Sequence, residues 1–150
     1  MLEAKGSAGG ILVGANADLF NMAVEVLNFS ISVMLTCNKT GFSWKFIVVY
    51  GPAYDEQKAS FLVGLEDVMS SWKGPLLIGS DFNLVRFVSD KSNVLINHRW
   101  ADCFNEWVDK WALVELNASN KRFTWTNNQD NLIYAKNLCL CRIDFCISLS

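Results

Sequence analysis

The sequence is poor in proline and glycine, and neither sign of charge dominates it. Its 150 residues include 2 Pro and 9 Gly, which excludes collagen-like and linker-like chains. The 13 basic and 15 acidic side chains give a formal net charge of -2. Because no overall positive field gathers polyanions, any contact with DNA is expected to be weak or absent unless it is local.

Long apolar runs and zinc-type cysteine pairs are also missing. No stretch approaches the roughly 20 apolar residues that a membrane-spanning helix requires, and the apolar stretch near the N-terminus is too short for a signal-peptide core. The 5 cysteines are an odd number and scattered, which is typical of reduced thiols inside the cell. Cys139, Cys141 and Cys146 are close together, but their spacing disfavours zinc, and the only histidine, His98, is distant in sequence. The sequence therefore predicts a soluble intracellular protein.

The apolar and aromatic content is sufficient for one packed domain. Hydrophobic residues make up 51% of the chain and aromatic residues 13%, which excludes a disordered or low-complexity segment. The sequence shows no internal repeat, no charge block and no linker. We therefore expect residues 1–150 to form a single α+β unit.

Alternating apolar and polar residues predict strands in the first third of the chain. Within residues 25–37 the odd positions from 27 to 35 are apolar, and turn-forming residues then lead to a second apolar run at 44–50. This pattern predicts a half-buried strand in an antiparallel hairpin, preceded by a strand at 10–14. Further strands are predicted at 76–78, 123–126 and about 138–148.

Two segments show the periodicity of amphipathic helices. Apolar residues recur at spacings of three and four over residues 61–72 and again over 100–111. Asp55 is placed to cap the first helix, after Gly51 and Pro52 end the preceding strand. Hairpin strands with helices inserted between later strands favour a sandwich of two mainly antiparallel sheets flanked by helices.

Asp81 and Asn83 are the first candidates for chemistry, because they follow a predicted buried strand. A carboxylate and a carboxamide two residues apart can point the same way. The carboxylate could then polarise a water or hold a cation, while the carboxamide donates to an anionic oxygen. Asp and Asn also bond to their own backbone in turns, and spacing alone favours that simpler interpretation.

Tyr50 and Asp144 are two further candidates. Tyr50 ends a predicted strand, where its phenol could donate to a phosphate oxygen or pack with its hydroxyl at the rim. Asp144 lies in an apolar run next to Arg142, so it is ion-paired, on an edge strand, or functional. His98 is expected to be a surface or capping residue, because no partner is placed to form a catalytic triad with it.

The order of these motifs resembles the endonuclease/exonuclease/phosphatase family, whose fold is called DNase I-like. The resemblance spans nearly the whole chain and is greatest to the endonuclease domains of plant non-long-terminal-repeat (LINE-type) retrotransposons, in which the endonuclease accompanies a reverse transcriptase. It rests on the segments Gly9-Gly10-Ile11-Leu12-Val13, Val48-Val49-Tyr50-Gly51-Pro52, Pro75-Leu76-Leu77-Ile78-Gly79-Ser80-Asp81-Phe82-Asn83-Leu84-Val85-Arg86, Phe123-Thr124-Trp125-Thr126 and Arg142-Ile143-Asp144.

The resemblance implies a four-layered α/β sandwich that hydrolyses a phosphodiester of DNA with Mg2+. It implies that Asp81 orients or deprotonates the attacking water, with Asp81 also a possible metal ligand, and that Asn83 holds the phosphate or the aspartate. It further implies that Tyr50 donates to a phosphate oxygen and that Asp144 orients a histidine. An anionic phosphodiester needs these groups, since a cation offsets its charge and neutral donors bind its oxygens.

The sequence departs from the family pattern in several places. We expect a partial domain that lacks the N-terminal strands with the metal-binding Glu and the C-terminal segment with the catalytic His. Ser80 also replaces a family glycine directly before Asp81. These departures predict that the chain alone is inactive, and they argue against Mg2+ being held by this chain alone. The alternatives are a catalytically dead binding or remnant domain and, last, a phosphatase of the same superfamily.

Overall fold

The computed structural model describes Ile11 and residues 13–92, 96–116, 125–126, 134–135 and 138–142. Two helices, α1 (Asp55–Ser70) and α2 (His98–Lys110), and a short 3-10 helix, η1 (Val88–Asp90), join the strands of one six-stranded sheet. Its strands are β1 (Phe20–Val26), β2 (Ser30–Cys37), β3 (Ser43–Tyr50), β4 (Leu76–Asp81), β8 (Leu138–Arg142) and β5 (Val114–Glu115), in the spatial order β1-β2-β3-β4-β8-β5. A separate two-stranded sheet pairs β6 (Trp125–Thr126) with β7 (Tyr134–Ala135).

The six-stranded sheet is mainly antiparallel, with one parallel pair. β1, β2 and β3 follow one another as antiparallel neighbours, and β8 is antiparallel to both β4 and β5. β3 and β4 run parallel, because the chain returns through α1 between them. Their carboxyl ends therefore meet at one end of the sheet, which places Tyr50 opposite Asp81.

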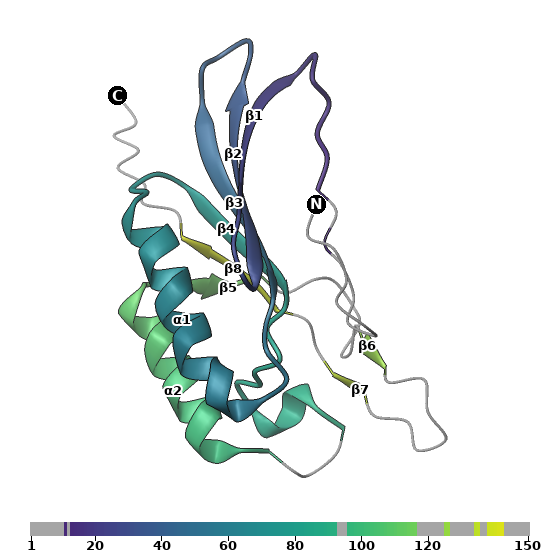
Figure 1. The fold of residues 1–150 in the computed structure, drawn as a ribbon, viewed down its shortest axis with the longest axis vertical. Coiled ribbons are helices and arrows are strands. Elements are labelled where there is room, and N and C mark those ends of the chain that lie inside the picture. Colours follow the sequence, from purple (N-terminus) through teal and green to yellow (C-terminus); the bar gives the residue numbers. More distant parts are fainter. Residues whose placement is uncertain are drawn as a thin grey trace.

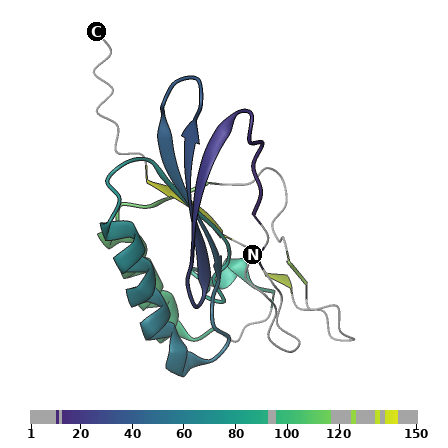
Figure 2. The same cartoon turned by 45° about the horizontal axis from the view of Figure 1, so that its top comes forward.

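Both helices cover the same face of the sheet, as Figures 1 and 2 show. Apolar side chains of α1 and α2 form the larger core with alternate residues of the central strands, including Ile47, Val49, Ile78 and Leu140. On the opposite face a second cluster joins Ile31, Val33 and Leu35 of β2 to Ile11. This is the α+β architecture that the pattern of hairpins and inserted helices predicts.

The helices begin and end for identifiable reasons. Asn97 is the N-cap of α2, where its side chain accepts a hydrogen bond from the backbone N–H of Trp100. The capping expectation for Asp55 is wrong, because Asp55 is the first residue of α1 and Tyr54 is its N-cap. The Asp55 carboxylate instead binds Lys58 and Asn97.

The single strand predicted at residues 25–37 is divided between two strands in the structure. Residues 20–37 form β1 and β2, and the backbone N–H of Leu27 donates to Ser30 O (2.9 Å) at the bend between them. The expectation that this segment has one buried face is also wrong at the start of β2, where Ser30 and Ser32 are as buried as Ile31. The hairpin of β2 with β3 is confirmed.

The other predicted strands differ from the structure mainly in where they begin and end. The strand expected at 76–78 extends through Asp81, because its carboxyl end stays paired with β3. Of the strand predicted at 10–14, Ile11 forms an isolated bridge and residues 13 and 14 are not in a strand, while residues 10 and 12 lie outside the described residues. The ends of the last two predicted strands, with Asp144 and Cys146, lie outside the described residues. Within the described part of the chain, neither helix has the length and apolar character needed to cross a membrane.

Candidate functional site

Three of the four candidate residues lie together at the carboxyl ends of β3 and β4. Tyr50 and Asp81 are partners in the parallel register, so their side chains project from the same face of the sheet. For Tyr50 that face is opposite the helices, since the preceding residue Val49 belongs to the helical core and Tyr50 itself packs against the second cluster. Asn83 follows two residues beyond Asp81, while Asp144 lies outside the described residues. Tyr50, Asp81 and Asn83 therefore lie at the same end of the sheet, and their roles stay predictions.

Asp81 and Asn83 form the turn that their spacing favours. The backbone N–H of Asn83 donates to Asp81 Oδ1 over 3.0 Å, which is an Asx turn. Asn83 has a φ of 49°, in the left-handed region that Asn tolerates better than most residues. The turn still leaves Asp81 available for chemistry. It engages only Oδ1 of the carboxylate, and the Asp81 residue is only partly buried.

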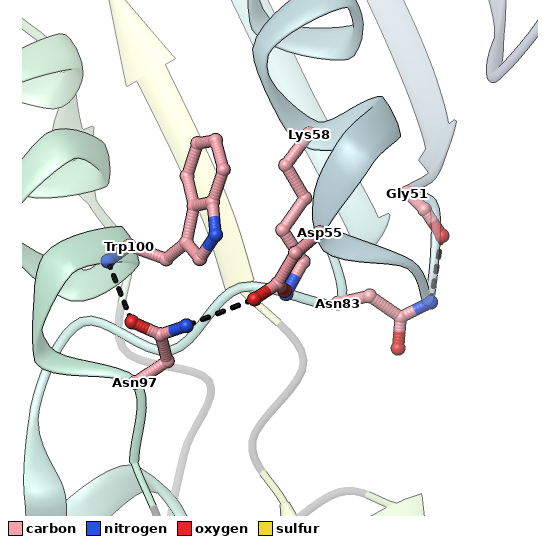
Figure 3. Close-up of polar contacts among 6 residues, drawn as sticks. All are labelled: Gly51, Asp55, Lys58, Asn83, Asn97 and Trp100. Atoms are coloured by element: carbon pink, nitrogen blue, oxygen red, sulfur yellow. Dashed lines mark hydrogen bonds and ion pairs between the residues drawn. The ribbon is translucent and has the colours of Figure 1, made fainter.

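The side chain of Asn83 reaches the other strand end. Its Nδ2 donates to Gly51 O over 2.6 Å, as Figure 3 shows. The backbone N–H of Gly51 in turn donates to Asp81 O over 2.7 Å. The loops after β3 and β4 are thus joined by hydrogen bonds in both directions, and we call these three residues the strand-end clasp: Gly51, Asp81 and Asn83.

Gly51 allows the two loops to approach this closely. A methyl group placed on its Cα would overlap the backbone carbonyl of Phe82. Phe82 itself is buried in the helical core, against Phe61 and Phe104. The position therefore requires glycine because of the space available, since backbone atoms cannot move aside as a side chain can.

A polar cluster next to the clasp links the first turns of the two helices. Asn97 Nδ2 donates to Asp55 Oδ2 over 2.9 Å, and Lys58 forms an ion pair of 2.7 Å with Asp55 Oδ1 (Figure 3). The hydrogen bond from Lys58 lowers the pKa of Asp55 below its ordinary value. Lys58 also lies over the Trp100 ring, 5.9 Å from its centroid. These groups satisfy one another and fix where α1 and α2 begin.

Arg86 holds the segment that follows Asn83. Its Nε donates to Asn105 Oδ1 (2.8 Å), and its Nη1 forms an ion pair of 3.0 Å with Glu115. Asn105 Nδ2 completes the exchange by donating to Arg86 O over 3.0 Å. Sequence reasoning missed this network, because its members are separated by up to 29 positions and show no periodicity.

The Mg2+ that the resemblance implies, and that the departures from the family pattern argue against for this chain alone, has one candidate carboxylate at this site among the described residues. Among the described residues no three His, Cys, Asp or Glu side chains gather around a common point. Asp81 is the carboxylate at the strand ends, beside the carboxamide of Asn83. Such a set fits Mg2+, which is often held by one or two carboxylates together with waters and substrate phosphates. It does not fit a closed cage made by protein side chains alone.

Comparison with known proteins defines the fold class. No protein-family profile matches the chain, and no curated protein matches its sequence. Solved structures do match, and they identify the architecture as the DNase I-like fold of endonuclease/exonuclease/phosphatase proteins. The identity is at most 16% in these matches, so they show the fold alone.

Two of these structures show the extent of the likeness. The endonuclease domain of TRAS1, a telomere-specific non-LTR retrotransposon, matches with a TM-score of 0.70, 14% identity and 94% of this chain covered. An endonuclease/exonuclease/phosphatase family protein from Bacteroides thetaiotaomicron matches with a TM-score of 0.50, 16% identity and 83% coverage. The chain spans 65% of the first structure and 52% of the second.

Proposed function

We propose that the chain is a retrotransposon-derived domain of the Mg2+-dependent DNA endonuclease type. The observation that carries the proposal is the convergence of Tyr50, Asp81 and Asn83 at the carboxyl ends of two parallel strands. The fold match to a retrotransposon endonuclease domain supports it. Strand ends and the loops after them are the usual position of functional residues, because the rigid sheet holds the mobile loops in place.

In phosphodiester hydrolysis Asp81, Tyr50 and Asp144 would each have a different role. Asp81 would orient the attacking water and accept its proton, and it would also be the carboxylate that holds Mg2+. When bound, the metal supplies charge neutralisation at the phosphate and lowers the pKa of water. Tyr50 would donate a hydrogen bond to a phosphate oxygen from the same face of the sheet. Asp144 remains a prediction as the residue that orients a histidine.

We propose further that these 150 residues do not hydrolyse DNA on their own. Described carboxylates and histidines form no cluster around Asp81, and the one histidine of the sequence, His98, opens α2 instead of following Asp144. Activity that depends on several groups acting together falls to a small residue when members are missing. The domain would then need residues from outside this sequence to become an active nuclease.

Metal binding tests the site without requiring activity. We expect Mn2+ to broaden the backbone amide signals of Tyr50, Gly51 and Asp81 in the nuclear magnetic resonance (NMR) spectrum and Mg2+ to reverse the effect. Asp81→Asn should abolish it, whereas the matched change Asp67→Asn, on the exposed face of α1, should not. Broadening that is unchanged in Asp81→Asn would contradict the assignment of the metal ligand.

A plasmid assay tests the activity. Supercoiled plasmid incubated with the chain and Mg2+ should remain intact. Nicking that disappears in Asp81→Ala would support Asp81 but refute the proposed inactivity. Salt-dependent binding of duplex DNA without metal binding would instead indicate the alternative, a catalytically dead binding domain.

A further inference from the structure

The outer side of β1 is the longer of the two free edges of the six-stranded sheet as the structure describes it. β1 stands first in the spatial order and has seven residues, whereas β5, at the other edge, has two (Figure 1). A long edge strand can pair with a further strand through its backbone groups, and a very short one cannot. Within the described sheet, β1 is therefore the edge that can accept a partner strand.

The register of β1 with β2 determines which backbone groups of β1 face outward. At one end of the pair, the N–H of Leu27 donates to Ser30 O over 2.9 Å. At the other end, Leu19 O accepts from the N–H of Asn38, also over 2.9 Å. Hydrogen-bonded pairs alternate along an antiparallel ladder, so the odd-numbered residues of β1 bond to β2. The even-numbered residues direct their N–H and C=O groups outward: Phe20, Met22, Val24 and Val26.

The same even-numbered residues carry the large apolar side chains of β1. The partners of Met22, Val24 and Val26 in β2 all belong to the second cluster, on the sheet face opposite the helices. These three side chains continue that apolar surface, yet they are 39%, 47% and 53% exposed. The outward backbone groups and the exposed apolar side chains thus belong to the same residues.

The sequence of β1 is complementary to itself when two copies run antiparallel about Ala23. This register places the outward-facing residues of one copy opposite those of the other, which allows about eight ladder hydrogen bonds. Met22 then lies opposite Val24 of the second copy, and Phe20 lies opposite Val26 of the second copy. The apolar side chains of both copies project from the same face, so together they cover surface that each copy exposes alone.

Charge and length favour the same register. Glu25 is the one charged residue of β1, and about Ala23 it lies opposite Asn21 of the second copy. The carboxylate therefore faces a carboxamide donor, and no two like charges are directly opposite. Registers centred on Met22 or Val24 also join outward-facing residues, but they pair a shorter part of the strand.

We propose that two copies of this chain associate through β1 as an antiparallel, twofold-symmetric pair. The assembly closes at two copies because each uses the same edge, and the two-residue β5 is too short for head-to-tail growth. β1 and β3 run in the same direction within each copy, so the strand-end clasps lie at opposite ends of the joined sheet. The association leaves both clasps outside the contact and does not depend on the proposed function.

Sedimentation velocity over a range of protein concentrations tests the association. We expect a reversible equilibrium between monomer and dimer. It should be weak, because one short ladder buries much less than the roughly 1,600 Å² of a standard interface. A monomer at every concentration would overturn the proposal, and so would growth beyond the dimer.

Charge variants at Asn21 test the register. Asn21→Lys places a cation opposite Glu25 of the second copy, whereas Asn21→Glu places a second carboxylate there. We expect the dissociation constant of the dimer to fall about fivefold in the first and rise about fivefold in the second, since each dimer holds two such pairs. Gln57→Lys and Gln57→Glu, at an exposed position of α1, make the same changes in net charge and should give equal constants. Equal constants for the two Asn21 variants would overturn the register.

Val24→Pro tests the backbone edge. Proline removes the outward N–H of residue 24 but no hydrogen bond to β2, and edge strands tolerate proline on that side. We expect the dissociation constant to rise about tenfold or more, because the two central pairs of the ladder are lost. A dimer of unchanged affinity would overturn the proposal.

Hydrogen exchange in the unmodified chain examines the same edge without any substitution. In the monomer the amides of Met22 and Val24 face solvent, and in the dimer they bond to the second copy. Their exchange, followed by NMR, should slow as the protein concentration rises. Exchange that stays constant while the dimer forms would overturn the proposal, even if Val24→Pro does not fold.

Discussion

The two ends of the β3–α1–β4 unit are built from different polar groups. At the carboxyl ends of the strands, neutral hydrogen bonds within the strand-end clasp join the loops. At the amino ends, two buried cations bind the carboxyl end of α1. Lys45 Nζ donates to Val68 O and Ser71 Oγ, and Arg142 Nη2 donates to Trp72 O over 2.6 Å.

The cations of the amino end compensate for something that α1 lacks. Its last turn contains no basic residue, although the carboxyl end of a helix carries partial negative charge. Lys45 from β3 and Arg142 from β8 supply that positive charge from the sheet. One end of the unit thus relies on charge against a helix terminus, and the other relies on close backbone approach. Steric changes should therefore affect the carboxyl end most, and pH should affect the amino end.

The largest expected effect is that of Gly51→Ala at the carboxyl end. The added methyl would overlap the Phe82 carbonyl, and we expect a loss of about 3 kcal/mol in the free energy of unfolding. Urea denaturation monitored by tryptophan fluorescence measures it. The matched change Gly64→Ala, on an exposed part of α1 with open space around it, should instead stabilise the chain by about 1 kcal/mol. Equal effects of the two changes would contradict the steric account.

Ser80→Gly should have a smaller effect of opposite sign. Ser80 has a φ of 111°, a conformation that side-chain-bearing residues rarely adopt, at the position where the resembled family carries glycine. Removing the side chain should relieve this strain and raise the free energy of unfolding by about 1 kcal/mol. Thermal unfolding measures the change. Ser32→Gly, in β2 and not at positive φ, should be destabilising, and stabilisation by both changes would exclude strain as the cause.

Lys45→Met should have the smallest effect at neutral pH, within about 1 kcal/mol, because Met replaces a buried charge by an apolar chain of similar length. Burial lowers the pKa of Lys45, and the charge of Glu25 partly opposes this shift. The unfolded chain therefore holds the Lys45 proton to higher pH than the folded chain. The contribution of Lys45 to stability should rise as pH passes through its folded pKa toward the ordinary value of 10.5.

Urea denaturation at pH 7 and pH 10 measures this contribution as a difference from the unmodified chain. The unmodified chain should gain stability relative to Lys45→Met as the pH rises. Lys39→Met, in the exposed turn between β2 and β3, should follow the unmodified chain at both values. A constant difference between Lys45→Met and the unmodified chain would show that Lys45 does not titrate differently on folding.

Much of the fold could be predicted because side chains that are buried on one face of a helix or strand recur at regular intervals in the sequence. The helical stripes of α1 and α2 and the hairpin of β2 and β3 follow from spacing alone. β1 was missed because its residues are almost all exposed. A signal was nevertheless present: Phe20, Met22, Val24 and Val26 are apolar at even positions, whereas β2 is apolar at odd positions. That change of phase marks the bend between the two strands.

The site could be predicted only in part. Asp81 and Asn83 were recognisable because they adjoin a buried strand, and the parallel register brings Tyr50 beside them. The hydrogen bond from Asn83 to Gly51 spans 32 positions, and the need for glycine at 51 depends on where Phe82 lies. Such contacts follow from tertiary packing, and no local pattern in the sequence encodes them.

The edge position of β1 affects how the molecule unfolds locally. It lies at the edge of the six-stranded sheet as described, its ladder runs to β2, and six of its seven residues are exposed. Separating β1 from β2 would expose little new apolar surface, in contrast to a central strand such as β4. β1 should therefore behave as a low-stability unit that exchanges its amide hydrogens through local unfolding, while the amides of β3 and β4 exchange only when the whole domain unfolds.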